Sequence, residues 1–62
     1  MNSKEIIKRL KQDGFEHTNT TGDHWKFKKA GRIVVVPHPK KDLPIGTVRN
    51  IYRQAGWEWG QQ

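Results

Sequence analysis

The chain contains no cysteine among its 62 residues. This absence excludes disulfide staples and thiolate zinc sites, and it is typical of proteins that work in a reducing compartment. Long hydrophobic runs are also missing: no apolar stretch approaches the roughly 20 residues of a membrane-spanning helix. The first ten residues lack the apolar centre of a signal peptide. We therefore expect a soluble, cytoplasmic protein without a membrane partner.

Apolar residues are scarce, at 32% of the chain. A chain of this length buries only about 60% of the surface that its unfolded form exposes, so the core must be thin. We expect one domain over residues 1–62, whose stability depends on few side chains or on a partner.

Acidic residues are absent from the centre of the sequence. Between His24 and Lys41 there are six basic residues and no acid, and the rest of the chain sums to zero, so this segment carries the whole net charge of +6. The six are Lys26, Lys28, Lys29, Arg32, Lys40 and Lys41. A focused positive field favours a polyanionic partner, and we predict these side chains as RNA contacts. The alternative is a solvated basic surface that only confers solubility.

Two segments have the apolar spacing of amphipathic helices. Their stripes are Ile6, Ile7 and Leu10 in the first, and Val48, Ile51, Tyr52 and Ala55 in the second. The first helix is predicted over residues 3–13, before Gly14. The second begins at Gly46 or Thr47 and is closed by Gly56.

Three short strands are predicted between the helices, over residues 15–20, 24–29 and 32–36. The middle strand alternates, with Trp25 and Phe27 on one face and His24, Lys26 and Lys28 on the other. If Ala30 and Gly31 form a two-residue loop, Phe27 pairs with Val34 and Trp25 with Val36; a three-residue loop swaps the faces of the third strand. The sequence leaves both registers open.

The order α-β-β-β-α predicts an α+β fold. Each helix has one apolar stripe and the sheet has one apolar face, so both helices should pack on one face of a three-stranded antiparallel sheet. This is the architecture of double-stranded-RNA-binding domains. The opposite face is left open, and it carries His24 together with Lys26 and Lys28.

His24 is the candidate catalytic residue, because an imidazole on a basic face can act as a general base toward an anionic substrate. The alternative is an ordinary surface histidine. His17 and His38 are interpreted as structural, with an acid or phosphate contact as the lesser possibility for His38. We predict no metal and no cofactor, since the acids are dispersed and the histidine spacings do not form a zinc pattern.

The two tryptophans of the last helix's tail, Trp57 and Trp59, admit two interpretations. They can stack on nucleobases, or Trp57 can close the core with Trp59 covering its edge. The second is favoured for so small a domain.

These residues resemble the HicA family, the toxins of HicAB toxin–antitoxin modules, over nearly the whole chain. The resemblance is carried by an opening helix that ends in Asp13-Gly14-Phe15, by a Gly22-Asp23-His24 turn, by Val34-Val35-Val36-Pro37-His38-Pro39, and by residues 46–56, GTVRNIYRQAG. It implies an mRNA interferase with His24 as the catalytic histidine, neutralised by a HicB-like antitoxin encoded beside it. The family usually has serine where this chain has Asp23.

The sequence leaves three alternative functions open. A ribonuclease would use His24 to deprotonate the 2′-hydroxyl of RNA, without a metal. A non-catalytic RNA-binding module would use the same basic face and tolerate replacement of His24. An interaction domain would dock an acidic partner there and show no RNA affinity. For the toxin, we expect an acidic antitoxin that covers His24, Lys26 or Lys28.

Overall fold

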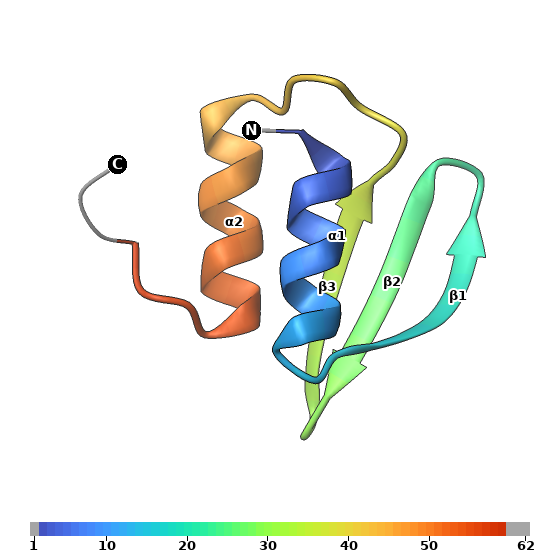
Figure 1. Ribbon diagram of the computed structural model, residues 1–62, viewed down its shortest axis with the longest axis vertical. Coiled ribbons are helices and arrows are strands. Elements are labelled where there is room, and N and C mark those ends of the chain that lie inside the picture. Colours follow the sequence, from blue (N-terminus) through green and yellow to red (C-terminus); the bar gives the residue numbers. More distant parts are fainter. Residues whose placement is uncertain (1, 60–62) are drawn as a thin grey trace.

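A computed structural model describes residues 2–59 of the chain (Figure 1). The elements follow the order α1 (Ser3–Gln12), β1 (Glu16–Thr21), β2 (His24–Lys29), β3 (Arg32–Pro37) and α2 (Ile45–Ala55). The predicted α-β-β-β-α order is confirmed. Within the described part of the chain, no helix is long and apolar enough to cross a membrane.

Helix α1 begins where its sequence provides a capping box. The Asn2 side chain accepts a hydrogen bond from the Glu5 backbone N–H at 2.8 Å, and the Glu5 carboxylate accepts one from the Asn2 N–H at 3.4 Å. This reciprocal pair satisfies two N–H groups that otherwise lack partners. The helix ends at Gln12, with Asp13 as its C-cap and Gly14 in the left-handed region at φ 94°. The predicted end is therefore one residue too late.

Helix α2 begins at Ile45, one residue before Gly46 and two before Thr47, the two predicted starts. Pro44 is the N-cap and has no side-chain cap hydrogen bond. The predicted end at Gly56 is confirmed: Gly56 has φ 76°, and the Trp57 N–H donates to the Tyr52 carbonyl at 2.8 Å. A left-handed glycine with such a bond is a common helix terminus.

The three strands form one antiparallel sheet in the order β1-β2-β3. Phe27 pairs with Val34 and Trp25 with Val36, so the two-residue loop is the correct alternative. The loop places Ala30 at φ 48°, a conformation that L-residues other than Asn and Asp rarely adopt. The pairing therefore overrides the local preference of alanine.

Strand β1 differs from its prediction by one residue at each end. Phe15 is 3% exposed and belongs to the core ahead of the strand, which runs from Glu16 to Thr21. The register of β1 on β2 shifts between His17 and Asn19. Such a bulge arises from strand pairing rather than from a local sequence signal.

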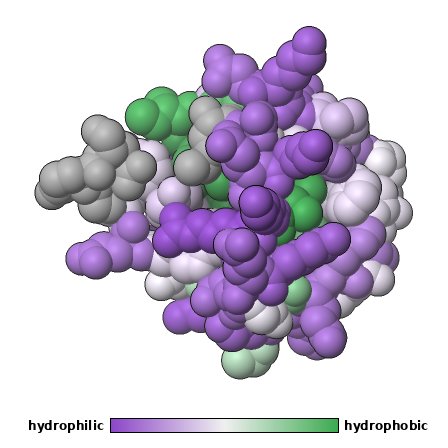
Figure 2. All heavy atoms as spheres, in the orientation of Figure 1, coloured by the Kyte–Doolittle hydropathy of each residue, from purple (hydrophilic) through white to green (hydrophobic). Residues whose placement is uncertain are grey.

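Both helices lie on the same side of the sheet and pack against β3, with β1 at the far edge (Figure 1). The core consists of Ile6, Ile7, Leu10, Phe15, Phe27, Val34, Val36, Leu43, Val48, Ile51, Tyr52 and Ala55. Hydrophilic side chains cover most of the helix side in the same view (Figure 2). The side of the sheet turned away from the helices is the open face.

Candidate functional site

The open face carries three of the candidate residues, His24, Lys26 and Lys28, as predicted. Phe27 is fully buried on the helix side, and the alternation of β2 turns His24, Lys26 and Lys28 the other way. All three are exposed, and the side chain of His24 is 63% exposed. The imidazole is therefore accessible to a large substrate.

Asp23 is the partner of His24 in the structure. Its carboxylate Oδ1 lies 3.3 Å from Nδ1 of the imidazole. A carboxylate at Nδ1 favours the tautomer that is protonated there and leaves the lone pair on Nε2 free. Sequence reasoning interpreted Asp23 as a residue that shapes the turn, because aspartate is common at turn positions. The available signal was that Asp23 directly precedes His24 in the sequence.

Glu16 is a second residue that the sequence interpretation missed. It pairs with Lys28 across β1 and β2, so an acid lies next to a lysine on the open face. Opposite charges on paired positions attract each other. The Glu16 carboxylate therefore reduces the positive field around Lys28, and the Asp23 carboxylate reduces it beside His24.

The six predicted RNA-binding cations lie in three groups. Lys26 and Lys28 share the open face with His24. Lys29 and Arg32 pair with each other at the far end of the β2–β3 hairpin and are turned to the helix side. Lys40 and Lys41 lie in the loop after β3. The structure therefore brings only some of the predicted cations close to His24.

Lys29 makes contacts with the end of α1. Its ammonium donates to the Asp13 backbone carbonyl, lies 3.5 Å from the Asp13 carboxylate and sits 5.6 Å from the centre of the Phe15 ring. Arg32 packs against Gly56, where an added Cβ would come within 2.7 Å of the Arg32 Cζ. Both cations have structural contacts of their own at the hairpin end.

The loop that carries Lys40 and Lys41 is held at the same end of the sheet as His24. The His38 N–H donates to the Asp23 carbonyl at 2.7 Å, and the Ser3 N–H donates to the Lys40 carbonyl at 2.9 Å. Lys4, Lys40 and Lys41 line a surface hollow there together with His38. These lysines therefore extend the positive charge beyond the end of β2.

The other two histidines lie on the helix side, in contact with Trp25. The His17 ring stacks on Trp25 with 4.5 Å between centroids, and its Nε2 is 2.7 Å from the Thr20 hydroxyl. The His38 ring meets Trp25 edge-on at 4.7 Å, and its Nδ1 is 2.7 Å from the Ser3 hydroxyl. These contacts support the structural interpretation of both histidines. Among the described residues, no three His, Asp or Glu side chains are placed to hold a metal ion.

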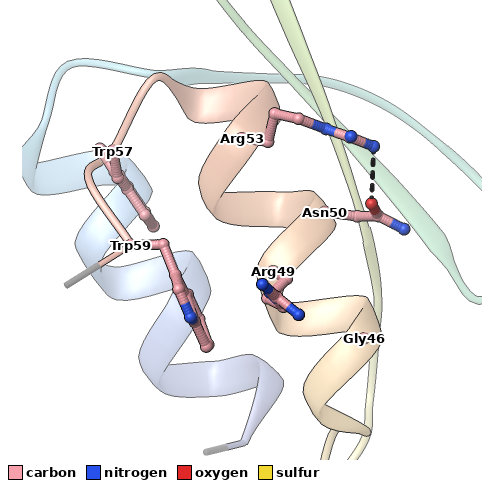
Figure 3. Close-up of a pocket in the computed structure, with 6 residues that line it drawn as sticks. All are labelled: Gly46, Arg49, Asn50, Arg53, Trp57 and Trp59. Carbon is pink, nitrogen blue, oxygen red and sulfur yellow. Dashed lines mark hydrogen bonds between the residues drawn. The ribbon is translucent and has the colours of Figure 1, made fainter. Parts of the chain in front are cut away.

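Trp57 and Trp59 pack on the core from the side of α2 that faces α1 (Figure 3). Their rings meet the Tyr52 ring edge-on, at 5.2 and 5.1 Å. The Trp57 indole N–H donates to Asp13 at 2.9 Å, and the Arg9 guanidinium lies 4.1 Å above the Trp57 ring. The indole hydrogen bond, together with the Lys29 ammonium, lowers the pKa of Asp13 below its usual value. The packing supports the structural interpretation of both tryptophans.

A surface hollow beside α2 was not anticipated. It is lined by Gly46, Arg49, Asn50, Arg53, Trp57 and Trp59, with Arg53 donating to Asn50 at 2.8 Å (Figure 3). The apolar stripe of the second helix leaves Arg49 and Arg53 on its solvated side, and spacing alone does not show that the tail folds back beside them.

The chain was compared with curated proteins and with protein-family models. A search of curated proteins gave no match. The family model described as HicA toxin of bacterial toxin–antitoxin systems matches residues 3–57, which include both helices, the sheet and the Asp23–His24 pair. The match covers most of the chain and runs through every element of the fold. The chain therefore belongs to the HicA toxin family.

Proposed function

We propose that this toxin is an endoribonuclease that cleaves mRNA in the cytoplasm, with His24 as its general base. The observation that carries the proposal is the exposed imidazole of His24, with a carboxylate at Nδ1 and two lysines on the same face. A base beside a third polar group is an arrangement that activates nucleophiles in many enzymes. In RNA the nucleophile belongs to the substrate.

The chemistry follows from the 2′-hydroxyl of RNA. Nε2 of His24 removes the proton from O2′ as O2′ bonds to phosphorus, and the bond from phosphorus to O5′ breaks. O5′ takes up a proton, so the products are a 2′,3′-cyclic phosphate and a 5′-hydroxyl. General-base assistance contributes roughly 10² to 10⁴ in rate. No metal is needed in this scheme.

The lysines of the open face serve the charge that develops at phosphorus. Lys26 and Lys28 stabilise the phosphorane, since fixed cations act most strongly where charge builds up. One of them also supplies the proton to O5′, because His38 is directed to the helix side by its contacts with Ser3 and Trp25. Lys40 and Lys41 hold flanking phosphates beyond the end of β2.

The binding partner besides RNA is an antitoxin, as membership of the family implies. We propose a HicB-like protein that is acidic where it docks and that covers His24. An acidic surface is attracted to the lysines of the open face, and this attraction accelerates association at low salt. Steric coverage of the imidazole then blocks the substrate.

The test is replacement of His24 by glutamine, with His17→Gln as the matched control. Both side chains are exposed on neighbouring strands, but only His24 lies on the open face. His24→Gln is expected to stay folded and to lose at least about a hundredfold in RNA cleavage, whereas His17→Gln keeps it. Full cleavage by a folded His24→Gln variant would refute the catalytic role.

The second candidate function is a non-catalytic RNA-binding module, which the lysines on the open face would serve equally well. It predicts RNA binding by the wild type and by His24→Gln alike, with cleavage by neither. Electrophoretic mobility shifts beside the cleavage assay separate the two.

A further inference from the structure

We propose that the β3 half of the open face is an apolar anchor for the antitoxin and is not used by RNA. The inference rests on the proposed function, since it concerns the protein that covers the open face. It gives the two halves of this face different roles: the charges on β2 bind both RNA and the antitoxin, and the apolar surface on β3 binds the antitoxin alone.

The open face is divided along the line between β2 and β3. Lys26 pairs with Val35 and Lys28 with Ile33, so a row of lysines lies beside a row of aliphatic side chains. Ile33 is 50% exposed and Val35 is partly exposed. Val34 and Val36 point the other way into the core. Ile33 and Val35 are therefore not the residues that hold β3 to the helices.

Neither strand propensity nor RNA accounts for this aliphatic row. Threonine is also β-branched and equally suited to an exposed strand position. Phosphates and sugars take polar contacts, and RNA bases stack on aromatic rings or guanidinium planes, so RNA gains little from isoleucine or valine. Protein interfaces, by contrast, place apolar side chains at the centre and charges around them.

The edge of β3 directs a partner to the face of the sheet. The Val35 N–H points out of the β2–β3 ladder and donates to the Gln54 side chain of α2 at 3.2 Å. An added strand would need this donor for its own pairing. Because α2 occupies it, the partner docks on the open face and not along the β3 edge.

The pairing of β2 with β3 indicates which side chains the docking segment of the partner presents. Side chains on paired positions of neighbouring strands have Cβ atoms about 5 Å apart. A partner that satisfies both halves must present carboxylates next to aliphatic or aromatic side chains. The occupant is thus an antitoxin segment with an acidic row beside an apolar row, and an all-acidic segment fits less well.

The experiment uses the wild-type chain, the double variant Ile33→Thr/Val35→Thr and the control Ile45→Thr. Threonine keeps β-branching, and Val35→Thr also keeps the shape of the side chain. Ile45 is 71% exposed at the start of α2, against 50% for Ile33, so the control removes an even more accessible isoleucine from the helix side. Each chain is titrated with the purified antitoxin of the same gene pair, and binding is measured by calorimetry.

The double variant is expected to cleave an RNA oligonucleotide within about twofold of the wild type and to lose at least about tenfold in antitoxin affinity. Ile45→Thr is expected to match the wild type in both assays. Calorimetry does not depend on cleavage, so an inactive wild type that still binds antitoxin would refute the proposed function alone.

Three results would overturn the inference. One is a double variant that binds antitoxin as tightly as the wild type. Another is a folded double variant that loses RNA cleavage, which would assign β3 to RNA. The third is an equal loss of affinity in Ile45→Thr, which would place the antitoxin on the helix side.

Discussion

At the scale of single residues, the candidate site depends on His24 and on Asp23, its neighbour in the sequence. His24 could be identified from the sequence because strand alternation separates it from Trp25 and Phe27. Its partner Asp23 could not, because a residue that ends a turn is free of that alternation. The 3.3 Å contact between the two side chains is a property of the folded turn.

The role of Asp23 is tested by Asp23→Asn. Asparagine keeps the turn preference and removes the charge that orients the imidazole. We expect cleavage to fall by about tenfold in single-turnover assays, a smaller loss than at a buried triad because the pair is exposed to water. RNA affinity should hold or rise, since a negative charge is lost. Unchanged cleavage would mean that Asp23 only shapes the turn.

Glu16 gives a prediction of opposite sign. It lies across from Lys28 on the open face and reduces the positive field that RNA meets. Glu16→Gln is therefore expected to increase RNA affinity by about two- to fivefold at low salt, an effect that should disappear at high salt as charges are screened. Filter binding at two salt concentrations measures both. Weaker binding of the variant would show that Glu16 itself contacts RNA.

At the scale of elements, the two helices were readily predictable and the hairpin was not. Continuous apolar stripes and closing glycines define α1 and α2 to within two residues of their observed bounds. The β2–β3 register remained open because Ala30 disfavours the positive φ that a two-residue loop requires. The burial of Val34 and Val36 in the core selects the two-residue loop. This burial depends on tertiary packing, which a short segment of sequence does not reveal.

The strain at Ala30 leads to a stability prediction. Asparagine tolerates the left-handed region better than alanine, and Asn-Gly is the preferred pair for this loop. Ala30→Asn is expected to stabilise the fold by about 0.5–1 kcal/mol, which corresponds to an increase in Tm of roughly 2–8 °C for a domain of this size. Thermal unfolding followed by circular dichroism measures the change. A lower Tm would contradict the assigned loop geometry.

At the scale of the whole molecule, Asp13 joins three distant parts of the chain. It follows α1, pairs with Lys29 at the end of β2, and accepts the Trp57 indole N–H beyond α2. The sequence predicted the helix end at this residue but gave no sign of these long-range contacts. These contacts form only when the residues after α2 and the end of β2 pack beside the end of α1, and the sequence does not show this packing.

The lowered pKa of Asp13 makes stability depend on pH. Because the ionised carboxylate is favoured in the folded state, its contribution is complete above the ordinary pKa of 3.8 and is lost as pH falls through the lower folded value. Asp13→Asn should therefore lower Tm at pH 7 and leave it nearly unchanged at the acidic end. Melting curves between about pH 2 and pH 7 test this. Equal effects of the variant at all pH values would exclude the ionised pair as the cause.

The most direct test of the central claim is end-group analysis of the cleaved RNA. A short RNA and the same strand with one 2′-deoxy nucleotide at the cleaved position are incubated with the wild type and with His24→Gln, in the presence of EDTA. We predict 2′,3′-cyclic phosphate and 5′-hydroxyl ends from the wild type on the all-RNA strand, and no cut at the deoxy position. His24→Gln should leave both strands intact. Ends bearing a 5′-phosphate, or cleavage at the deoxy position, would contradict attack by the 2′-hydroxyl and with it the role of His24.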